Sequence, residues 1–198
     1  RHYSHLNKKN EKQILLPDAT IRNDEKSVAV LVIGESARSS NFSLYGYEKN
    51  TNPLLSQIEG LKHFKAESCA TYTTAGLKCI LEHKNTSKLY EILPNYLYRN
   101  DVEVIWKTTN WGEPKVSIEN FQNKNSLRTD CEGDNCDYDG ILLNGLKEQI
   151  LASKKNKILV VLHTSTSHGP TYYKKYPKQF EKFTPVCKSV ELANCTQQ

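Results

Sequence analysis

Three runs of apolar residues along the chain are predicted as strands of one sheet. They cover 28–33 (VAVLVI), 102–106 (VEVIW) and 158–162 (ILVVL). The first and third runs are almost wholly apolar, a pattern typical of strands that are covered on both faces. We therefore expect these strands to lie in the buried interior of a sheet.

Helical patterns separate the predicted strands. They run from Thr74 to about Glu82, from Ser87 to Arg99 and from Gly140 to about Ser153. Strands that alternate with helices indicate the α/β class with a largely parallel sheet. The stretch 120–139 is polar and rich in Asn and Asp, which predicts a loop.

Length and composition limit what the chain can be. Its 198 residues are enough for one domain with a sizeable core. Its mean hydropathy is -0.64, and no apolar run approaches the roughly 20 residues of a membrane-spanning helix. The polar stretch 1–26 is interpreted as a linker or arm from a missing membrane region, and 27–198 as part of a domain. The chain begins at Arg1 and has no Met, which suggests a processed piece of a longer protein.

The net charge of +5 does not indicate a nucleic-acid partner, because the lysines are spread along the chain and mixed with acidic residues. The cysteines are more informative. They form three close sequential pairs: Cys69 with Cys79, Cys131 with Cys136, and Cys187 with Cys195. Zinc is an alternative, but no pair has the two-residue spacing of a zinc knuckle. We favour disulfides, which imply the periplasm or the extracellular space.

Polar residues follow each predicted strand directly. The segments are 34–36 (GES), 107–112 (KTTNWG, with Lys115 close behind) and 163–170 (HTSTSHGP). The carboxyl ends of parallel strands share one edge of a sheet, where ligands bind. Glu35 there is either a helix cap or a site residue. His168, in its Ser-His-Gly-Pro turn, is a better site candidate than His163, which we expect to pack at its strand end.

The stretch 68–79 (SCATYTTAGLKC) places hydroxyl groups before a helix. Thr71, Thr73 and Thr74 precede or begin the helical pattern, inside one cysteine pair. A hydroxyl at a helix N-terminus lies in a positive potential that suits a phosphate group. The alternative is that one of these threonines is only an N-cap.

Together these motifs resemble a known family. Residues 32–53 (VIGESARSSNFSLYGYEKNTNP), 68–79 and 167–176 (SHGPTYYKKY) are similar to the periplasmic catalytic domain of bacterial phosphoethanolamine transferases. That family includes the mobile colistin-resistance enzymes, which cause polymyxin resistance, and belongs to the alkaline phosphatase/sulfatase superfamily. The resemblance extends from about Val28 over nearly the whole chain. It implies an α/β/α sandwich with a largely parallel sheet, and its family disulfides match the three cysteine pairs.

The resemblance also implies roles for particular residues. Thr73 corresponds to the nucleophile that carries phosphoethanolamine as a covalent intermediate, and Glu35 and Thr73 correspond to ligands of Zn2+. His168, Asn110 and Lys115 correspond to substrate-binding residues. The donor would be phosphatidylethanolamine, and the acceptor lipid A, a core sugar or a surface protein.

Further expectations follow from the family pattern. The family completes its zinc site with an Asp-His pair, which we expect beyond Gln198, so that the domain would be incomplete at its C-terminus. The resemblance places the protein at the bacterial inner membrane, with a catalytic domain, most simply a monomer, facing the periplasm. Two alternatives stay open. One is another superfamily activity (phosphoglycerol transferase, sulfatase or phosphodiesterase), and the other is a non-catalytic, disulfide-stapled binding domain.

Overall fold

A four-stranded, fully parallel sheet forms the centre of the molecule, with the strand order β1-β4-β2-β3. The computed structural model describes residues 13–195, apart from the side chains at 134 and 135. The strands are β1 (Ser27–Ile33), β2 (Glu103–Thr108), β3 (Asn120–Gln122) and β4 (Lys157–His163). The prediction of an α/β fold with a largely parallel sheet is confirmed.

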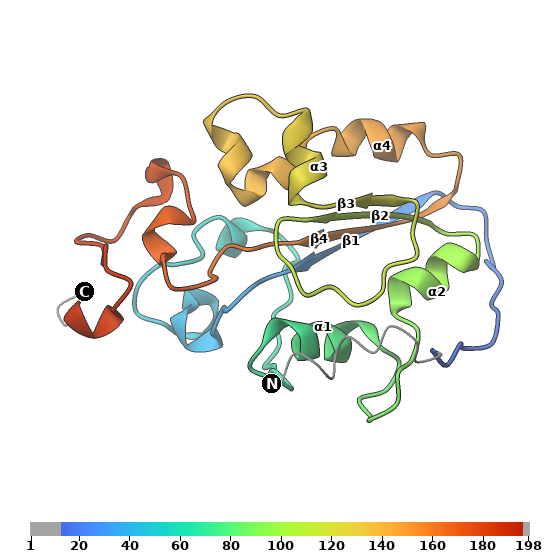
Figure 1. Ribbon diagram of the computed structural model, residues 1–198, viewed down its shortest axis with the longest axis horizontal. Coiled ribbons are helices and arrows are strands. Elements are labelled where there is room, and N and C mark those ends of the chain that lie inside the picture. The colour runs from blue at the N-terminus through green and yellow to red at the C-terminus, as the bar shows by residue number, and fades with distance from the viewer. Residues whose placement is uncertain (1–12, 196–198) are drawn as a thin grey trace.

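Helices cover both faces of this sheet (Figure 1). Helices α1 (Thr73–Leu81) and α2 (Leu93–Arg99) lie on one face, and α3 (Lys124–Thr129) and α4 (Leu146–Ala152) on the other. Short 3-10 turns complete the chain at Ser39–Asn41, Ser43–Tyr45, Leu55–Gln57, Asp134–Asp137, Asp139–Leu143, Tyr172–Lys174, Lys178–Phe180 and Leu192–Asn194. The expected α/β/α sandwich is therefore observed. No helix among the described residues is long and apolar enough to cross a membrane.

The core is divided in two because successive strand residues point to opposite faces. Val104 and Trp106 of β2 pack with Leu77 and Leu81 of α1. Ile105, between them, belongs to the second cluster with Leu127, Leu142 and Leu146 on the other face. The β4 residues alternate between the two clusters in the same way, and Val160 and Val161 are fully buried.

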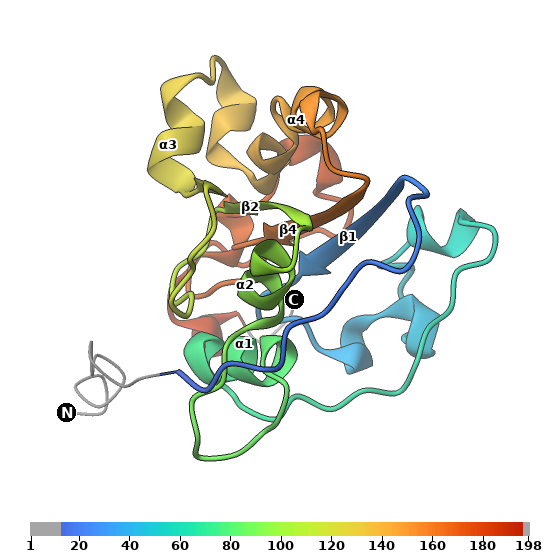
Figure 2. The ribbon, with the colours of Figure 1, turned by 90° about the vertical axis from the view of Figure 1, so that its right-hand side faces the viewer.

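Strand β1 differs from its prediction. Val28, Val30 and Val32 are 42%, 54% and 60% exposed, although β4 is buried on both faces as expected. Ile33 packs towards α1, so the three valines face the α3–α4 layer. That layer covers β2 and β4 but does not extend over β1 (Figure 2). An apolar run predicts a strand, but its burial depends on which layer reaches it.

Two predicted helices are shorter than their patterns suggested. The helix predicted at 87–99 begins only at Leu93, with Pro94 in its first turn, where proline is favoured. The preceding residues are extended instead, and Tyr90 forms a parallel bridge with Ile14. The helix predicted at 140–153 is interrupted by Gly145, which has a φ of 62° and separates a 3-10 turn from α4.

The polar stretch 120–139 is more regular than the predicted loop. It contains β3, which pairs with β2, and the short helix α3. Asn123 caps α3 by accepting hydrogen bonds from the backbone N–H groups of Asn125 and Ser126. Local capping and edge pairing therefore create elements in a segment that has little apolar periodicity.

The segment that precedes β1 is fastened to α2 by a buried ion pair. Glu91 is 2% exposed and accepts two hydrogen bonds from the Arg99 guanidinium, at 2.6 and 2.8 Å. The carboxylate also accepts from the backbone N–H of Leu16 at 2.6 Å, and Arg99 donates to the Leu16 carbonyl. The hydrogen bonds from Arg99, helped by that from Leu16 and opposed by burial, hold the pKa of Glu91 below its ordinary value.

We expect Glu91→Gln to lower the melting temperature by about 5 °C at pH 7, because it removes one charge of a buried hydrogen-bonded pair. The pKa of Glu91 is lowered in the folded state, so its stabilisation is present above its ordinary pKa of 4.5 and is lost as the pH falls through the lower folded value. The difference between variant and wild type should therefore shrink at pH 3. Thermal unfolding at pH 7 and pH 3 measures the difference in melting temperature, and Glu48→Gln, on an exposed glutamate, is the control. An equal difference at both pH values would contradict this origin.

All three predicted disulfides are confirmed. They join Cys69 to Cys79, Cys131 to Cys136 and Cys187 to Cys195. The first joins α1 to the segment that precedes it, and so restrains the backbone around Thr73. The third lies in the C-terminal part of the chain, next to the turn Leu192–Asn194.

Candidate active site

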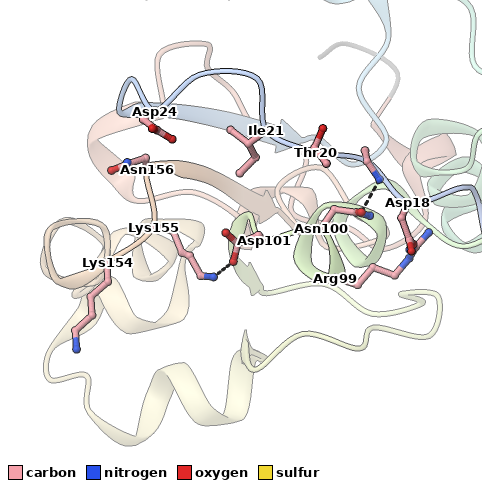
Figure 3. A pocket seen from close by; sticks show the side chains of 11 residues that line it. Asp18, Thr20, Ile21, Asp24, Arg99, Asn100, Asp101, Lys154, Lys155 and Asn156 are labelled. Carbon is pink, nitrogen blue, oxygen red and sulfur yellow. Dashed lines mark hydrogen bonds and ion pairs between the residues drawn. The ribbon is translucent and has the colours of Figure 1, made fainter.

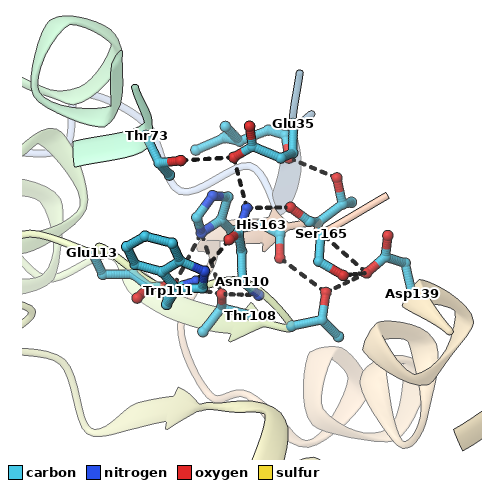
Figure 4. Close-up of polar contacts among 12 residues, drawn as sticks. Glu35, Thr73, Thr108, Asn110, Trp111, Glu113, Asp139, His163 and Ser165 are labelled. Carbon is cyan, nitrogen blue, oxygen red and sulfur yellow. Dashed lines mark hydrogen bonds and ion pairs between the residues drawn. The ribbon is translucent and has the colours of Figure 1, made fainter. Parts of the chain in front are cut away.

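Side chains from three strand ends meet at the carboxyl edge of the sheet (Figure 4). Glu35 follows β1 and Asn110 follows β2, while Thr164 directly follows β4. Asn110 joins the other two, because its Nδ2 donates to Glu35 Oε2 at 2.9 Å and to the carbonyl of Thr164 at 2.8 Å. Parallel strands place their carboxyl ends side by side, so residues far apart in the sequence become neighbours here.

Helix α1 brings Thr73 to the same point. Thr73 is the first residue of the helix, and its hydroxyl donates to Glu35 Oε2 at 2.9 Å. The N-cap residue is Tyr72, so Thr73 is not an N-cap. Glu35 is not a helix cap either, because a separate 3-10 turn with N-cap Arg38 follows it. The structure therefore disagrees with the capping interpretation of both residues.

The Glu35 carboxylate is held in its charged form. Burial alone would raise its pKa, but hydrogen bonds from Ser36, Asn110 and Thr73 and the nearby His168 together lower the pKa below the ordinary value. Ser36 has a φ of 50°, which is uncommon for a residue other than glycine. Its hydroxyl donates to Glu35 Oε1 at 2.7 Å. A strained turn therefore follows the carboxylate directly, as is often found at functional sites.

His168 lies at the rim of this group and is half-buried. Its Nδ1 is 2.8 Å from the carbonyl of Gly169, so Nδ1 carries a proton and donates it to this oxygen. The ring of Trp111 lies 5.7 Å from that of His168. Gly112 comes next with a φ of 88°, and a Cβ there would approach Thr74 Cγ2 to 3.0 Å. The loop after β2 therefore packs closely on the N-terminus of α1.

Two lysines do not join this group. Lys115 is exposed, and its carbonyl oxygen accepts from Asn95 Nδ2; its side chain is not among the groups that contact Glu35 or Thr73 in the described residues. Lys107 was expected at the rim of the strand ends, but it is fully buried and donates to the carbonyl of Asn144. The alternation of side chains along a strand explains why Lys107 is buried. Lys107 is still inside β2 and points into the sandwich.

A buried cluster of Glu113, Thr108 and His163 lies beside the site and was not predicted. His163 is 1% exposed, which confirms the expectation that it packs at the end of its strand. Its Nδ1 lies 3.0 Å from Glu113 Oε1 and 3.2 Å from Thr108 Oγ1. Burial would raise the pKa of Glu113, but hydrogen bonds from His163 and Thr108 lower it. The sequence signal was the position of Glu113, three residues after Asn110 in the same strand-end segment.

This cluster determines which nitrogen of His163 carries a proton. An ionised Glu113 only accepts, and the single hydroxyl hydrogen of Thr108 is donated to Glu113. Nδ1–H of His163 must therefore be the donor in both contacts. Nε2 is buried and has no hydrogen-bond partner among the described residues.

We expect nitrogen NMR shifts of His163 to show a protonated Nδ1 in the wild-type protein. In Glu113→Gln, the amide can donate as well as accept, so the tautomers should interconvert or reverse. His83, which is not part of the cluster, serves as the internal control in the same spectrum. A His163 proton on Nε2 alone in the wild type would contradict the assigned hydrogen bonds.

A cavity of about 630 Å³ opens at this edge, and its lining includes Glu35, Arg38, Thr73 and His163. Another hollow of about 610 Å³ lies at the amino ends of the strands (Figure 3). Four of its six charged side chains are paired with one another, Lys155 with Asp101 and Arg99 with Asp18. The cavity at the carboxyl edge is therefore the better candidate for substrate binding.

The donor atoms at this edge suit a divalent metal in part. The carboxylate of Glu35 and the hydroxyl of Thr73 are 2.9 Å apart, close enough to share one zinc ion as two of its four ligands. Within residues 13–195, no group of three or more His, Cys, Asp or Glu side chains could hold a metal. The remaining zinc ligands would have to be groups other than such a cluster of described side chains.

Comparison with known proteins identifies the family of the chain. Residues 27–197 match the sulfatase family model. The chain is 40% identical over 183 residues to phosphoethanolamine transferase EptA of Helicobacter pylori, an alignment that covers 89% of this chain and 35% of that protein. It therefore spans about a third of the length of the curated relatives that it matches.

Two solved structures have the same fold. One is the C-terminal periplasmic domain of phosphoethanolamine transferase EptC from Campylobacter jejuni, with a TM-score of 0.68 and 32% identity over 90% of this chain and 59% of that one. The other is the integral membrane protein EptA from Neisseria meningitidis, with a TM-score of 0.74 and 28% identity over 98% of this chain and 39% of that one. The chain belongs to the sulfatase family and is homologous to its phosphoethanolamine transferases.

Proposed function

We propose that this chain is part of an enzyme that transfers phosphoethanolamine from phosphatidylethanolamine to lipid A or another surface acceptor. The observation that carries the proposal is the Thr73 hydroxyl at the N-terminus of α1, 2.9 Å from the Glu35 carboxylate. The relatives that are named phosphoethanolamine transferases support the substrate class. The two solved structures, one a periplasmic domain and the other an integral membrane protein, support a periplasmic domain of a membrane protein.

Thr73 would act as the nucleophile in a two-step reaction. Its Oγ1 attacks the phosphorus of the donor lipid, an O–P bond to Thr73 forms, and the bond to diacylglycerol breaks. The proton that the Thr73 hydroxyl gives up ends on the oxygen of the departing diacylglycerol. An oxygen of the acceptor then attacks the same phosphorus, and the bond to Thr73 breaks and restores the hydroxyl. Splitting a transfer in this way is typical of covalent catalysis.

The neighbouring groups would orient the phosphate. The free backbone N–H groups at the start of α1 point towards an anion at Thr73, and the helix dipole favours negative charge there. Asn110 would act through Glu35, because its amide already donates to Glu35 Oε2 and to the Thr164 carbonyl, while the ring of His168 would contact the headgroup. These groups position the headgroup for in-line attack by Thr73.

Glu35 and Thr73 are the proposed zinc ligands of this chain. A bound zinc ion lowers the pKa of a coordinated hydroxyl and neutralises phosphate charge, which makes a threonine effective near neutral pH. Glu35 suits this role because its pKa is lowered, so its carboxylate stays ionised and able to coordinate. Asn110 and Ser36 hold its two oxygens in place.

A sulfatase activity is the second candidate, because the matching family model is that of the sulfatases. Sulfatases need a modifiable Cys or Ser as nucleophile. The residue at the start of α1 is Thr73, neither Cys nor Ser, and the cysteines of the same segment, Cys69 and Cys79, are joined in a disulfide. This arrangement favours the transferase.

The test uses the full-length membrane protein with phosphatidylethanolamine labelled in its headgroup. Purified lipid A is the acceptor, and mass spectrometry detects the product. We expect labelled phosphoethanolamine on lipid A and diacylglycerol as the second product. A parallel panel of sulfate esters should not be hydrolysed. Hydrolysis of sulfate esters without headgroup transfer would overturn the proposal.

A further inference from the structure

The carboxylate of Asp139 is surrounded by hydrogen-bond donors from two strand-end loops. Asp139 begins a 3-10 turn. Its Oδ1 accepts from Thr109 Oγ1, from the backbone N–H of Ser165 at 3.0 Å and from Ser165 Oγ at 3.3 Å. Its Oδ2 accepts from Thr166 Oγ1 at 2.7 Å. A carboxylate accepts about four such hydrogen bonds, and this one has four.

The loop after β4 is fixed on its other side by β1. The backbone N–H and the hydroxyl of Thr164 both donate to the carbonyl of Ile33, at 3.0 and 3.1 Å. The loop therefore runs between β1, which leads to Glu35, and Asp139. Ser165 continues the connection, because its carbonyl accepts from the backbone N–H of His168 at 3.0 Å. Asp139 thus reaches His168 through one intervening residue.

We propose that Asp139 is a positioning residue that holds the His168 loop against the candidate active site. This inference rests on the proposed function. Thr166 is exposed and Ser165 only partly buried, so hydrogen bonds rather than packing order this segment. An acceptor-only carboxylate suits this position best, because all four of its contacts donate to it. Without Asp139, Nε2 of His168 loses its fixed position, and small displacements of a substrate-orienting group cost about 10²-fold in rate.

A double-mutant cycle in the full-length protein tests this inference. Asp139→Ala should lower kcat for headgroup transfer by about 10- to 100-fold. The KM for the donor lipid should change far less, because Asp139 does not touch substrate. In a His168→Ala background, Asp139→Ala should have almost no further effect, since residues that act through one another are not additive.

Conservative variants separate positioning from folding. Asp139→Asn keeps an acceptor for Ser165 N–H and should recover part of kcat. Thr166→Val removes only the contact to Asp139 Oδ2 and leaves the carboxylate intact. It therefore tests the positioning role of Asp139 if Asp139→Ala does not fold. It should lower kcat by a few-fold in the wild type and not at all in His168→Ala. Asp130→Asn, on an exposed aspartate at the end of α3, is the control expected to match the wild type.

The outcomes are distinguishable. If the wild type transfers headgroup and the losses of Asp139→Ala and His168→Ala multiply, Asp139 does not act through His168 and the inference is wrong. If the wild type does not transfer headgroup, the proposed function is wrong. NMR signals of the His168 ring then still test the positioning role without substrate. They should shift or broaden in Asp139→Ala and stay unchanged in Asp130→Asn, and unchanged signals in both variants would overturn the inference.

Discussion

Replacing Thr73 by alanine should abolish both headgroup transfer and the covalent adduct. We expect a loss of about 10³-fold or more, the size seen when a catalytic nucleophile is removed. The hydroxyl is the group that bonds to phosphorus in the proposed first step, and alanine offers no oxygen in its place. Mass spectrometry of peptides from full-length protein incubated with donor lipid alone should find phosphoethanolamine on Thr73 in the wild type and none in the variant.

Controls separate this chemical effect from a structural one. Thr73→Ser keeps the hydroxyl and should keep measurable transfer. Thr129→Ala, on α3 at the other face of the sheet, should match the wild type. Because Thr71 and Thr74 are close neighbours of Thr73, the adduct must be located within the peptide. An adduct on Thr71 or Thr74 would show that Thr73 is not the nucleophile, even if headgroup transfer itself were confirmed.

Glu35→Gln should have the second largest effect, with a loss of transfer on the order of 10³-fold. The amide has nearly the same shape as the carboxylate, but it lacks the charge that would hold zinc, and its NH2 group would oppose the donors Thr73 and Asn110. Zinc content, measured on the purified full-length protein, should fall in parallel. The exposed Glu59→Gln is the matched control.

The same variant distinguishes a metal ligand from a structural acceptor. A structural role would lower the melting temperature and leave the zinc content of the folded fraction unchanged. The ligand role predicts a lowered zinc content with secondary structure retained. Full zinc content together with full transfer in Glu35→Gln would exclude Glu35 from the proposed metal site.

Much of the site was predictable because its residues follow strands directly. Glu35 and Asn110 stand in polar segments that follow apolar runs, and the geometry of a parallel sheet brings such segments to one edge. The hydroxyls beside a helix start within a cysteine pair indicated Thr71, Thr73 and Thr74 together, and only the family resemblance singled out Thr73. For Lys115, which the resemblance placed among the substrate-binding residues, the side chain is exposed and makes no hydrogen bond to Glu35 or Thr73 within residues 13–195.

Glu113 and Asp139 were missed for a common reason. Each is an ordinary acidic residue in a polar stretch, and nothing in its immediate sequence shows which donors it meets. The partners of Asp139 lie about 26 to 30 residues away along the chain, in Thr109, Ser165 and Thr166. Burial of Glu113 likewise depends on the packing of the β2 loop against β4.

The sequence alone determined the fold class, the disulfide pairs and the edge of the sheet where the chemistry lies. These properties follow from local patterns: apolar runs, cysteine spacing and the residues that end each strand. Only the tertiary structure decided that β1 is exposed on one face, that Thr73 meets Glu35 rather than capping α1, and that Asp139 reaches the His168 loop. Each of these depends on contacts between segments distant in sequence, and such contacts leave no periodic or local signal in the chain.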